Sequence, residues 1–168
     1  MPGLTPLGTF HTAISLIAVG SGLVALVRDK AIFPKTQVGR IYVITTVITC
    51  VTGFGIFAHG TFGAPHVLGV ITLAVLGLAA VAGNSRLFGR VAPYVETISY
   101  SATFLFHMIP AIAETSTRLP VGAPLLASAE APALQAANAV MFVAFLIGAA
   151  LQARHIHRAP ARRLPLAA

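Results

Sequence analysis

The chain has 168 residues, of which 57% are hydrophobic and only 9% are charged. Its mean hydropathy is +0.87. Soluble domains carry roughly 25% charged residues, because a surface in contact with water must be solvated. The composition therefore excludes an ordinary soluble domain and predicts an all-α integral membrane protein. The net charge of +7 does not indicate a nucleic-acid partner, because the basic residues lie in short connections between apolar segments.

Five segments are apolar and long enough to approach the roughly 20 residues that a membrane-spanning helix needs. No Lys or Arg precedes the first one, and Arg28, Asp29 and Lys30 follow it. A secretory signal peptide has the opposite layout, so we expect a retained first helix. A glycine-rich turn at 59–65 makes the second and third helices antiparallel neighbours, and the fourth begins near Pro93. The expected spans cover about residues 7–27, 41–58, 66–83, 93–113 and 134–153.

The basic residues predict the orientation of this five-helix bundle, because cytoplasmic connections of membrane proteins are rich in Lys and Arg. With the N-terminus outside and the C-terminus in the cytoplasm, only Arg118 of the 11 basic residues lies outside. Residues 1–158 then form one transmembrane domain, and residues 159–168 form a basic cytoplasmic tail attracted to lipid headgroups. The ten basic residues on the cytoplasmic side are Arg28, Lys30, Lys35, Arg40, Arg86, Arg90, Arg154, Arg158, Arg162 and Arg163.

Four histidines, one from each of the first four predicted helices, lie at similar depths. With a rise of about 1.5 Å per residue, they lie about 21 to 30 Å from the cytoplasmic ends of their helices. This places them in one band of the outer leaflet, roughly 10 Å deep. They are His11, His59, His66 and His107.

Polar residues also recur at helical spacing in two of the expected spans, and such stripes should face the interior of the bundle. The second span carries Tyr42, Thr45, Thr49, Thr52 and His59. The fourth span carries Glu96, Tyr100, Thr103, His107 and Glu114, and Pro110 lies on the same face of the helix.

Three interpretations of the histidines stay open. In the first, His11 and His107 ligate the iron of haem b for electron transfer to a redox partner, and Arg118 meets a propionate. In the second, a transition metal such as zinc or copper is bound by three or four histidines, with or without Glu114. In the third, the histidines only form hydrogen bonds within a structural or accessory subunit of a larger membrane complex. The candidate metal ligands are His11, His59, His66, His107 and Glu114.

The stripe in the fourth span supports a different function. Intramembrane carboxylates and histidines often form proton paths, so Glu96, Tyr100 and Thr103 together with His107 could serve a proton-coupled or small-solute transporter or channel. The simpler interpretation is that Glu96 lies near the start of its helix because the positive end of the helix dipole stabilises a negative charge there. The sequence contains no phosphate-binding loop, nucleophile elbow or paired catalytic carboxylates. It leaves enzymatic activity and homo-oligomerisation open.

Three segments resemble an uncharacterised bacterial family of small multi-pass membrane proteins. They are residues 10–13 (FHTA), 38–43 (VGRIYV) and 65–69 (PHVLG), within the first three expected helices. Members of that family often carry a histidine just before the Gly-Arg-x-Tyr entry to the second helix, whereas this chain has Thr36 and Gln37 there. The resemblance implies a location in the bacterial cytoplasmic membrane and no particular activity.

Overall fold

The computed structural model describes residues 5–57 and 61–158, which form five α-helices, one short 3-10 helix and no strand. The all-helical prediction is therefore confirmed for this part of the chain. The helices are α1 (Pro6–Asp29), α2 (Gln37–Gly53), α3 (Ala64–Asn84), η1 (Gly89–Val91), α4 (Ala92–Arg118) and α5 (Pro132–Arg158).

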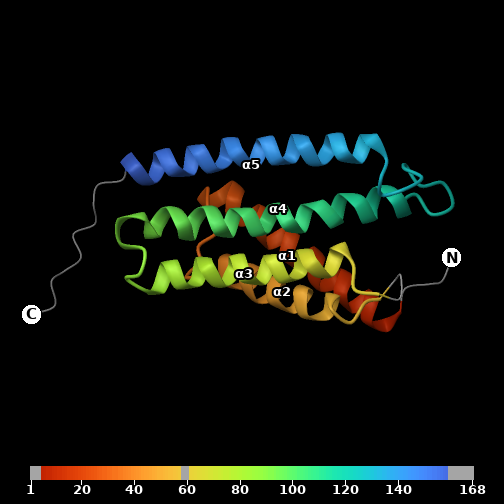
Figure 1. Ribbon diagram of the computed structural model, residues 1–168, viewed down its shortest axis with the longest axis horizontal. Helices are drawn as coiled ribbons and strands as arrows, with labels where there is room; N and C mark the ends of the chain where they lie inside the picture. The colour runs from red at the N-terminus through yellow and green to blue at the C-terminus, as the bar shows by residue number, and fades with distance from the viewer. Residues whose placement is uncertain (1–4, 58–60, 159–168) are drawn as a thin grey trace, which may run out of the picture.

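The first four helices form a bundle, and α5 lies alongside α4 (Figure 1). The closest neighbours are α1 with α2 and α3 with α4, while α2 packs on α3 and α1 approaches α4 more loosely. No Cα atom of α2 lies within 8 Å of a Cα atom of α4. These two helices therefore occupy diagonal corners, and the side chains that join them must cross the centre of the bundle.

Three of the five helices, α1, α3 and α5, are long and apolar enough to cross a membrane. The expectation of five such spans is thus confirmed for three. One of the other two, α2, has 17 residues and ends at Gly53, five residues before the expected end. The other, α4, is long, but its buried face carries polar residues that lower its hydropathy. It also continues to Arg118, past the expected end at residue 113.

The distribution of side chains supports a membrane protein. Large apolar side chains are exposed along α1, α3 and α5, among them Leu16, Val70 and Ile147. Buried positions instead include many polar residues, and Thr46 and Thr103 are 0% exposed. A soluble monomer rarely exposes so extended an apolar surface. In lipid, by contrast, apolar side chains face outward and polar ones face the bundle interior.

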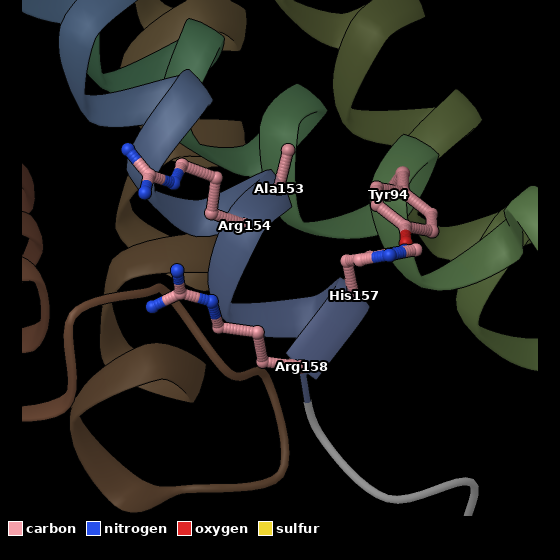
Figure 2. A pocket seen from close by; sticks show the side chains of 5 residues that line it. All are labelled: Tyr94, Ala153, Arg154, His157 and Arg158. Carbon is pink, nitrogen blue, oxygen red and sulfur yellow. The ribbon is translucent and has the colours of Figure 1, made fainter.

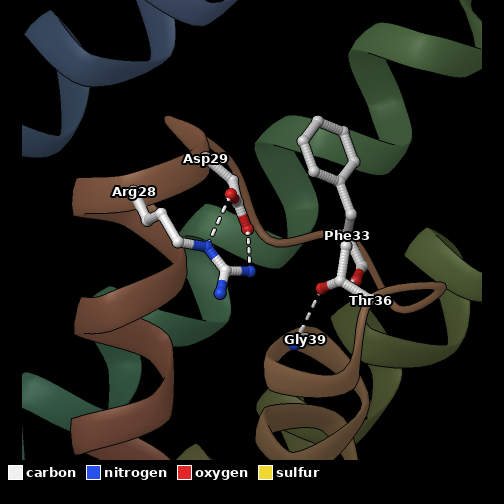
Figure 3. Close-up of polar contacts among 5 residues, drawn as sticks. All are labelled: Arg28, Asp29, Phe33, Thr36 and Gly39. Carbon is white, nitrogen blue, oxygen red and sulfur yellow. Dashed lines mark hydrogen bonds and ion pairs between the residues drawn. The ribbon is translucent and has the colours of Figure 1, made fainter.

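The connection from α1 to α2 is held by capping interactions (Figure 3). Lys30 ends α1 in the left-handed conformation, with φ of 62°. The Thr36 hydroxyl donates to the carbonyl of Phe33 over 2.9 Å and accepts from the Gly39 amide over 3.1 Å, which caps α2. Such a cap satisfies an amide that has no partner within the helix. It fixes the start of α2 and hence the depth of its threonines.

A buried glutamine attaches α5 to the rest of the bundle. The Gln152 side-chain amide donates to the carbonyl of Lys30 over 2.8 Å, and its oxygen accepts from the Ser101 hydroxyl over 3.0 Å. Gln152 and Leu134 are the buried residues of α5. This helix is therefore held at two points and leaves most of its surface to lipid.

Candidate functional site in the polar centre of the bundle

Two hydrogen bonds cross the centre of the bundle between the diagonal helices α2 and α4. The hydroxyl groups of Tyr42 and Thr103 are hydrogen-bonded, with 2.8 Å between their oxygen atoms. The Nε2 atom of His107 lies 3.1 Å from the Thr46 hydroxyl. Each pair is buried, and the second lies four residues, or about one turn, beyond the first on both helices. The two contacts thus form successive rungs along the bundle axis.

The direction of the first rung follows from the number of protons available. Thr103 has one hydroxyl proton, which it donates to the carbonyl of Tyr100 over 2.8 Å. Its oxygen must then accept the proton of Tyr42. Tyr42 also packs edge-on against the His107 ring, with centroids 6.1 Å apart. One aromatic residue therefore contacts both rungs.

His11 of α1 contacts the same face of α2 nearer its C-terminal end. Its Nδ1 atom lies 3.0 Å from the Thr52 hydroxyl. That hydroxyl donates its proton to the carbonyl of Ile48 over 2.8 Å, so it accepts from His11 Nδ1. The neutral imidazole then has its free lone pair on Nε2. A lone pair of this kind can accept a proton or ligate a metal.

Thr49 lies between the two threonines that bind the histidines, three residues from each. Its side chain is 7% exposed, and its hydroxyl oxygen has no hydrogen-bond partner within the described part of the chain. An isolated buried hydroxyl is costly, and such groups usually bind a water molecule or an ion. Thr49 therefore adds a hydroxyl without a partner to the polar stretch of α2 between Thr46 and Thr52.

His66 has a structural role. It is the third residue of α3, and its Nδ1 accepts from the Gly63 amide over 3.1 Å, which caps the helix. Its ring stacks between Phe57 and Phe62, with centroids 4.9 and 4.8 Å away. The ring proton is then on Nε2, which is buried without a partner among the described residues. In this tautomer neither ring nitrogen offers a free lone pair to a metal.

This role predicts a graded effect of substitution on stability. His66→Ala should lower the free energy of unfolding by about 1–2 kcal/mol, because it removes both the cap and the aromatic sandwich. His66→Gln should recover part of this loss, since a Gln at this helix position can cap in the same way. Unfolding in mixed detergent micelles measures both values, with the exposed His157→Ala as control. Equal stability of the Ala and Gln variants would contradict the capping role.

The two carboxylates of α4 lie in different environments. Glu96 is partly buried, and its carboxylate packs against Gly83 of α3, where a Cβ atom would collide with it. A larger residue at position 83 would require the flexible Glu96 side chain to shift. Glu114 is exposed and forms an ion pair with Arg118 one turn later. The two residues expected to serve a metal and a haem propionate therefore bind each other.

The structure brings together only part of the predicted site. His11 and His107 contact α2 six residues apart, which corresponds to about 9 Å along its axis. His66 is held apart in its aromatic sandwich. His59 lies outside the described residues, as does the tail 159–168. Among the described residues, no group of three or more His, Cys, Asp or Glu side chains could hold a metal ion.

Sequence reasoning missed several residues of the polar interior, and Thr46 and Gln152 are the two that join helices most directly. Thr46 binds His107, but the helical stripe was drawn through its neighbour Thr45, whose hydroxyl bonds to carbonyls of its own helix. The available signal was that Thr46 lies four residues after Tyr42 and so shares its face of the helix. Gln152 was also missed, although it is an amide that follows an apolar run of 13 residues, 139–151. In a membrane helix such a residue usually contacts another helix.

Comparisons with models of protein families, with curated proteins and with solved structures found no match.

Proposed function

We propose that this protein transfers protons through the polar centre of its helix bundle, as a proton-coupled transporter or channel. All five helices then cross the membrane, with the N-terminus outside and the C-terminus in the cytoplasm. The polar faces of α2 and α4 are compatible with this arrangement, because their neighbours shield them from lipid. The proposal also includes a bacterial cytoplasmic-membrane location, which rests on the family resemblance.

The two rungs across the bundle carry this proposal. Glu96 lies one turn before Tyr100 on α4, and the Thr103 hydroxyl must rotate away from the Tyr100 carbonyl, its acceptor, before it passes a proton on. The Thr103 hydroxyl is hydrogen-bonded to the Tyr42 hydroxyl. One turn further along α2, the Thr46 hydroxyl contacts His107. Beyond that point lie the unpartnered Thr49 hydroxyl and the His11–Thr52 pair. Hydroxyl groups and imidazoles each accept one proton and release another, so a file of them connected by water can relay protons.

Glu96 is the expected proton entry, since it is the carboxylate of this file nearest the predicted cytoplasmic end. In liposomes with an imposed pH gradient, Glu96→Gln should lower proton flux about tenfold or more, equivalent to at least about 1.4 kcal/mol of added barrier. A pH-sensitive dye inside the vesicles measures the flux. Glu130→Gln makes the same chemical change at an exposed residue of the connection before α5 and should leave the flux unchanged. No flux above empty liposomes in the wild-type protein would refute the proposal.

A transition metal bound near His11 and His107 is a second candidate. The free lone pair of His11 Nε2 and the unpartnered Thr49 hydroxyl favour it. A metal there would use His11 and small ligands such as water, with His107 close to the same segment of α2. Zinc would act as a Lewis acid, and copper could also carry an electron. Elemental analysis of the purified protein tests this, with the exposed His157→Gln as control for His11→Gln.

Haem b between His11 and His107 has less support from the geometry. Haem ligation through Nε2 of His107 would displace Thr46 from that atom. The ring would also need space where Tyr42, Thr46 and Thr103 are almost fully buried against one another. If haem bound there, its porphyrin would supply one-electron redox chemistry. The absorption spectrum decides this directly, because bound haem gives an intense Soret band.

A structural or accessory subunit remains the third candidate, and His66 favours it. Its capping and stacking contacts show how a membrane histidine can act without chemistry. If the rungs likewise only hold helices together, flux would be absent and the protein would purify with a larger complex.

A further inference from the structure

An elongated cavity of about 710 Å³ lies between the end of α1, α4 and α5. Its volume is in the range of small-molecule sites. Along α5 it runs from Met141 to Ile156, which corresponds to about 22 Å. One leaflet of the hydrocarbon core is about 15 Å thick. The cavity is therefore long enough for a hydrocarbon chain of one leaflet together with part of its headgroup.

The lining changes character along this length. Toward the middle of the bundle it is apolar, with Phe104, Met141 and Phe145. At the other end it reaches Asp29, Lys30 and His155. Between these ends, Ser101 and Gln152 hydrogen-bond to each other. Such a gradient fits a molecule with an apolar chain and a polar head.

The charges at the polar end determine which head is favoured. The carboxylate of Asp29 accepts two hydrogen bonds from Arg28, at 2.8 and 2.7 Å, so its charge is already compensated. Lys30 is exposed, and its ammonium group donates to the carbonyl of Val27, which leaves its charge uncompensated. His155 of α5 is also exposed. The end of the cavity therefore has an excess of positive charge.

A second cavity of about 430 Å³ lies against the same end of α5 and adds cations. It is lined by Tyr94, Ala153, Arg154, His157 and Arg158 (Figure 2). Figure 2 shows His157 extending toward Tyr94, while the guanidinium groups of Arg154 and Arg158 extend away from that ring. This end of α5 is thus surrounded by donors for anionic groups.

We propose that the larger cavity binds an anionic phospholipid, with one acyl chain between α4 and α5 and the phosphate at Lys30 and His155. The cavity has room because α5 contacts α4 alone among the helices and is buried at only two residues. Bound lipid would fill the space between α5 and the end of α1. This site is distinct from the proton path and does not depend on it.

Gly148 allows the cavity to be filled without disturbing the bundle. It lines the cavity, and a Cβ atom placed there meets no other atom within 4 Å. Gly148→Leu should therefore fold normally and block the acyl chain. Gly20→Leu is the matched control, because Gly20 also has open space around it and does not line the cavity. Ala144→Phe, which also enters the cavity, provides a second blocking variant.

Native mass spectrometry with added phosphatidylglycerol or phosphatidylcholine tests the proposal. The wild type and Gly20→Leu should retain phosphatidylglycerol at least several-fold more than phosphatidylcholine, and both blocking variants should lose this retention. A Lys30→Asn, His155→Gln double variant should lose the preference for the anionic lipid, since asparagine tolerates the left-handed backbone at residue 30.

Three results would overturn the proposal. One is equal retention of phosphatidylglycerol by the wild type and by the blocking variants, when thermal unfolding shows that these fold. Another is equal retention of the two lipids by the wild type. A third concerns a neutral lipophile such as an isoprenoid quinone. If its binding is lost in Gly148→Leu but unchanged in the double charge variant, the cavity belongs to that class of ligand.

Discussion

Gly22→Leu should cause the largest loss of stability of any substitution considered for this chain. A Cβ atom at residue 22 would lie 2.6 Å from a ring carbon of Phe104 and 2.9 Å from one of Tyr42. Tyr42 is 0% exposed and bound to Thr103, so it cannot move without breaking a rung. Overpacking of a well-packed core usually costs about 1–3 kcal/mol, and the broken hydrogen bond adds about 0.6–1.7 kcal/mol.

The measurement is the free energy of unfolding in mixed micelles. Gly20→Leu is a demanding control, because it places the same side chain in the same helix only two residues earlier, where no atom lies within 4 Å. We expect it to stay within about 0.5 kcal/mol of the wild type. Similar stabilities for the two leucine variants would mean that α1 does not approach α4 and α2 as the structure shows. The result therefore tests the geometry of the proposed site.

Thr46→Val should have the largest effect on function for the smallest change in shape. Valine keeps the branched side chain but cannot bind His107 Nε2, and so it breaks the second rung. We expect proton flux to fall about tenfold or more. The free energy of unfolding should fall only by about 0.6–1.7 kcal/mol, as for other hydrogen bonds between membrane helices.

Thr45→Val is the matched control, because the Thr45 hydroxyl donates to carbonyls of its own helix and contacts no histidine. Its flux should equal that of the wild type. A double-mutant cycle with His107→Leu separates the pair from the rest of the bundle. If Thr46→Val loses stability while keeping full flux, then the rung joins helices and transfers no proton. That outcome would favour the structural interpretation.

The sequence by itself determined the class of protein and the rough positions of its helices. Long apolar segments separated by charged connections predict membrane helices from transfer free energies alone, and α1, α3 and α5 confirm this. Helical periodicity also identified the polar face of α4, where Thr103 and His107 are buried. The end of α2 was placed too late, because Gly53 and Gly55 stop a helix through local backbone energetics that hydropathy does not include.

Only the tertiary structure decided which polar residues meet. Periodicity gives the face of one helix, but a pairing such as Thr46 with His107 depends on the relative rotation and height of two helices that are not neighbours. The same holds for His66, whose depth resembled that of the other histidines although Gly63 and two phenylalanines hold it apart. It holds also for the cavity beside α5, whose lining comes from the end of α1, from α4 and from α5. Packing contacts between distant segments fix these features, and no single segment of the sequence contains them.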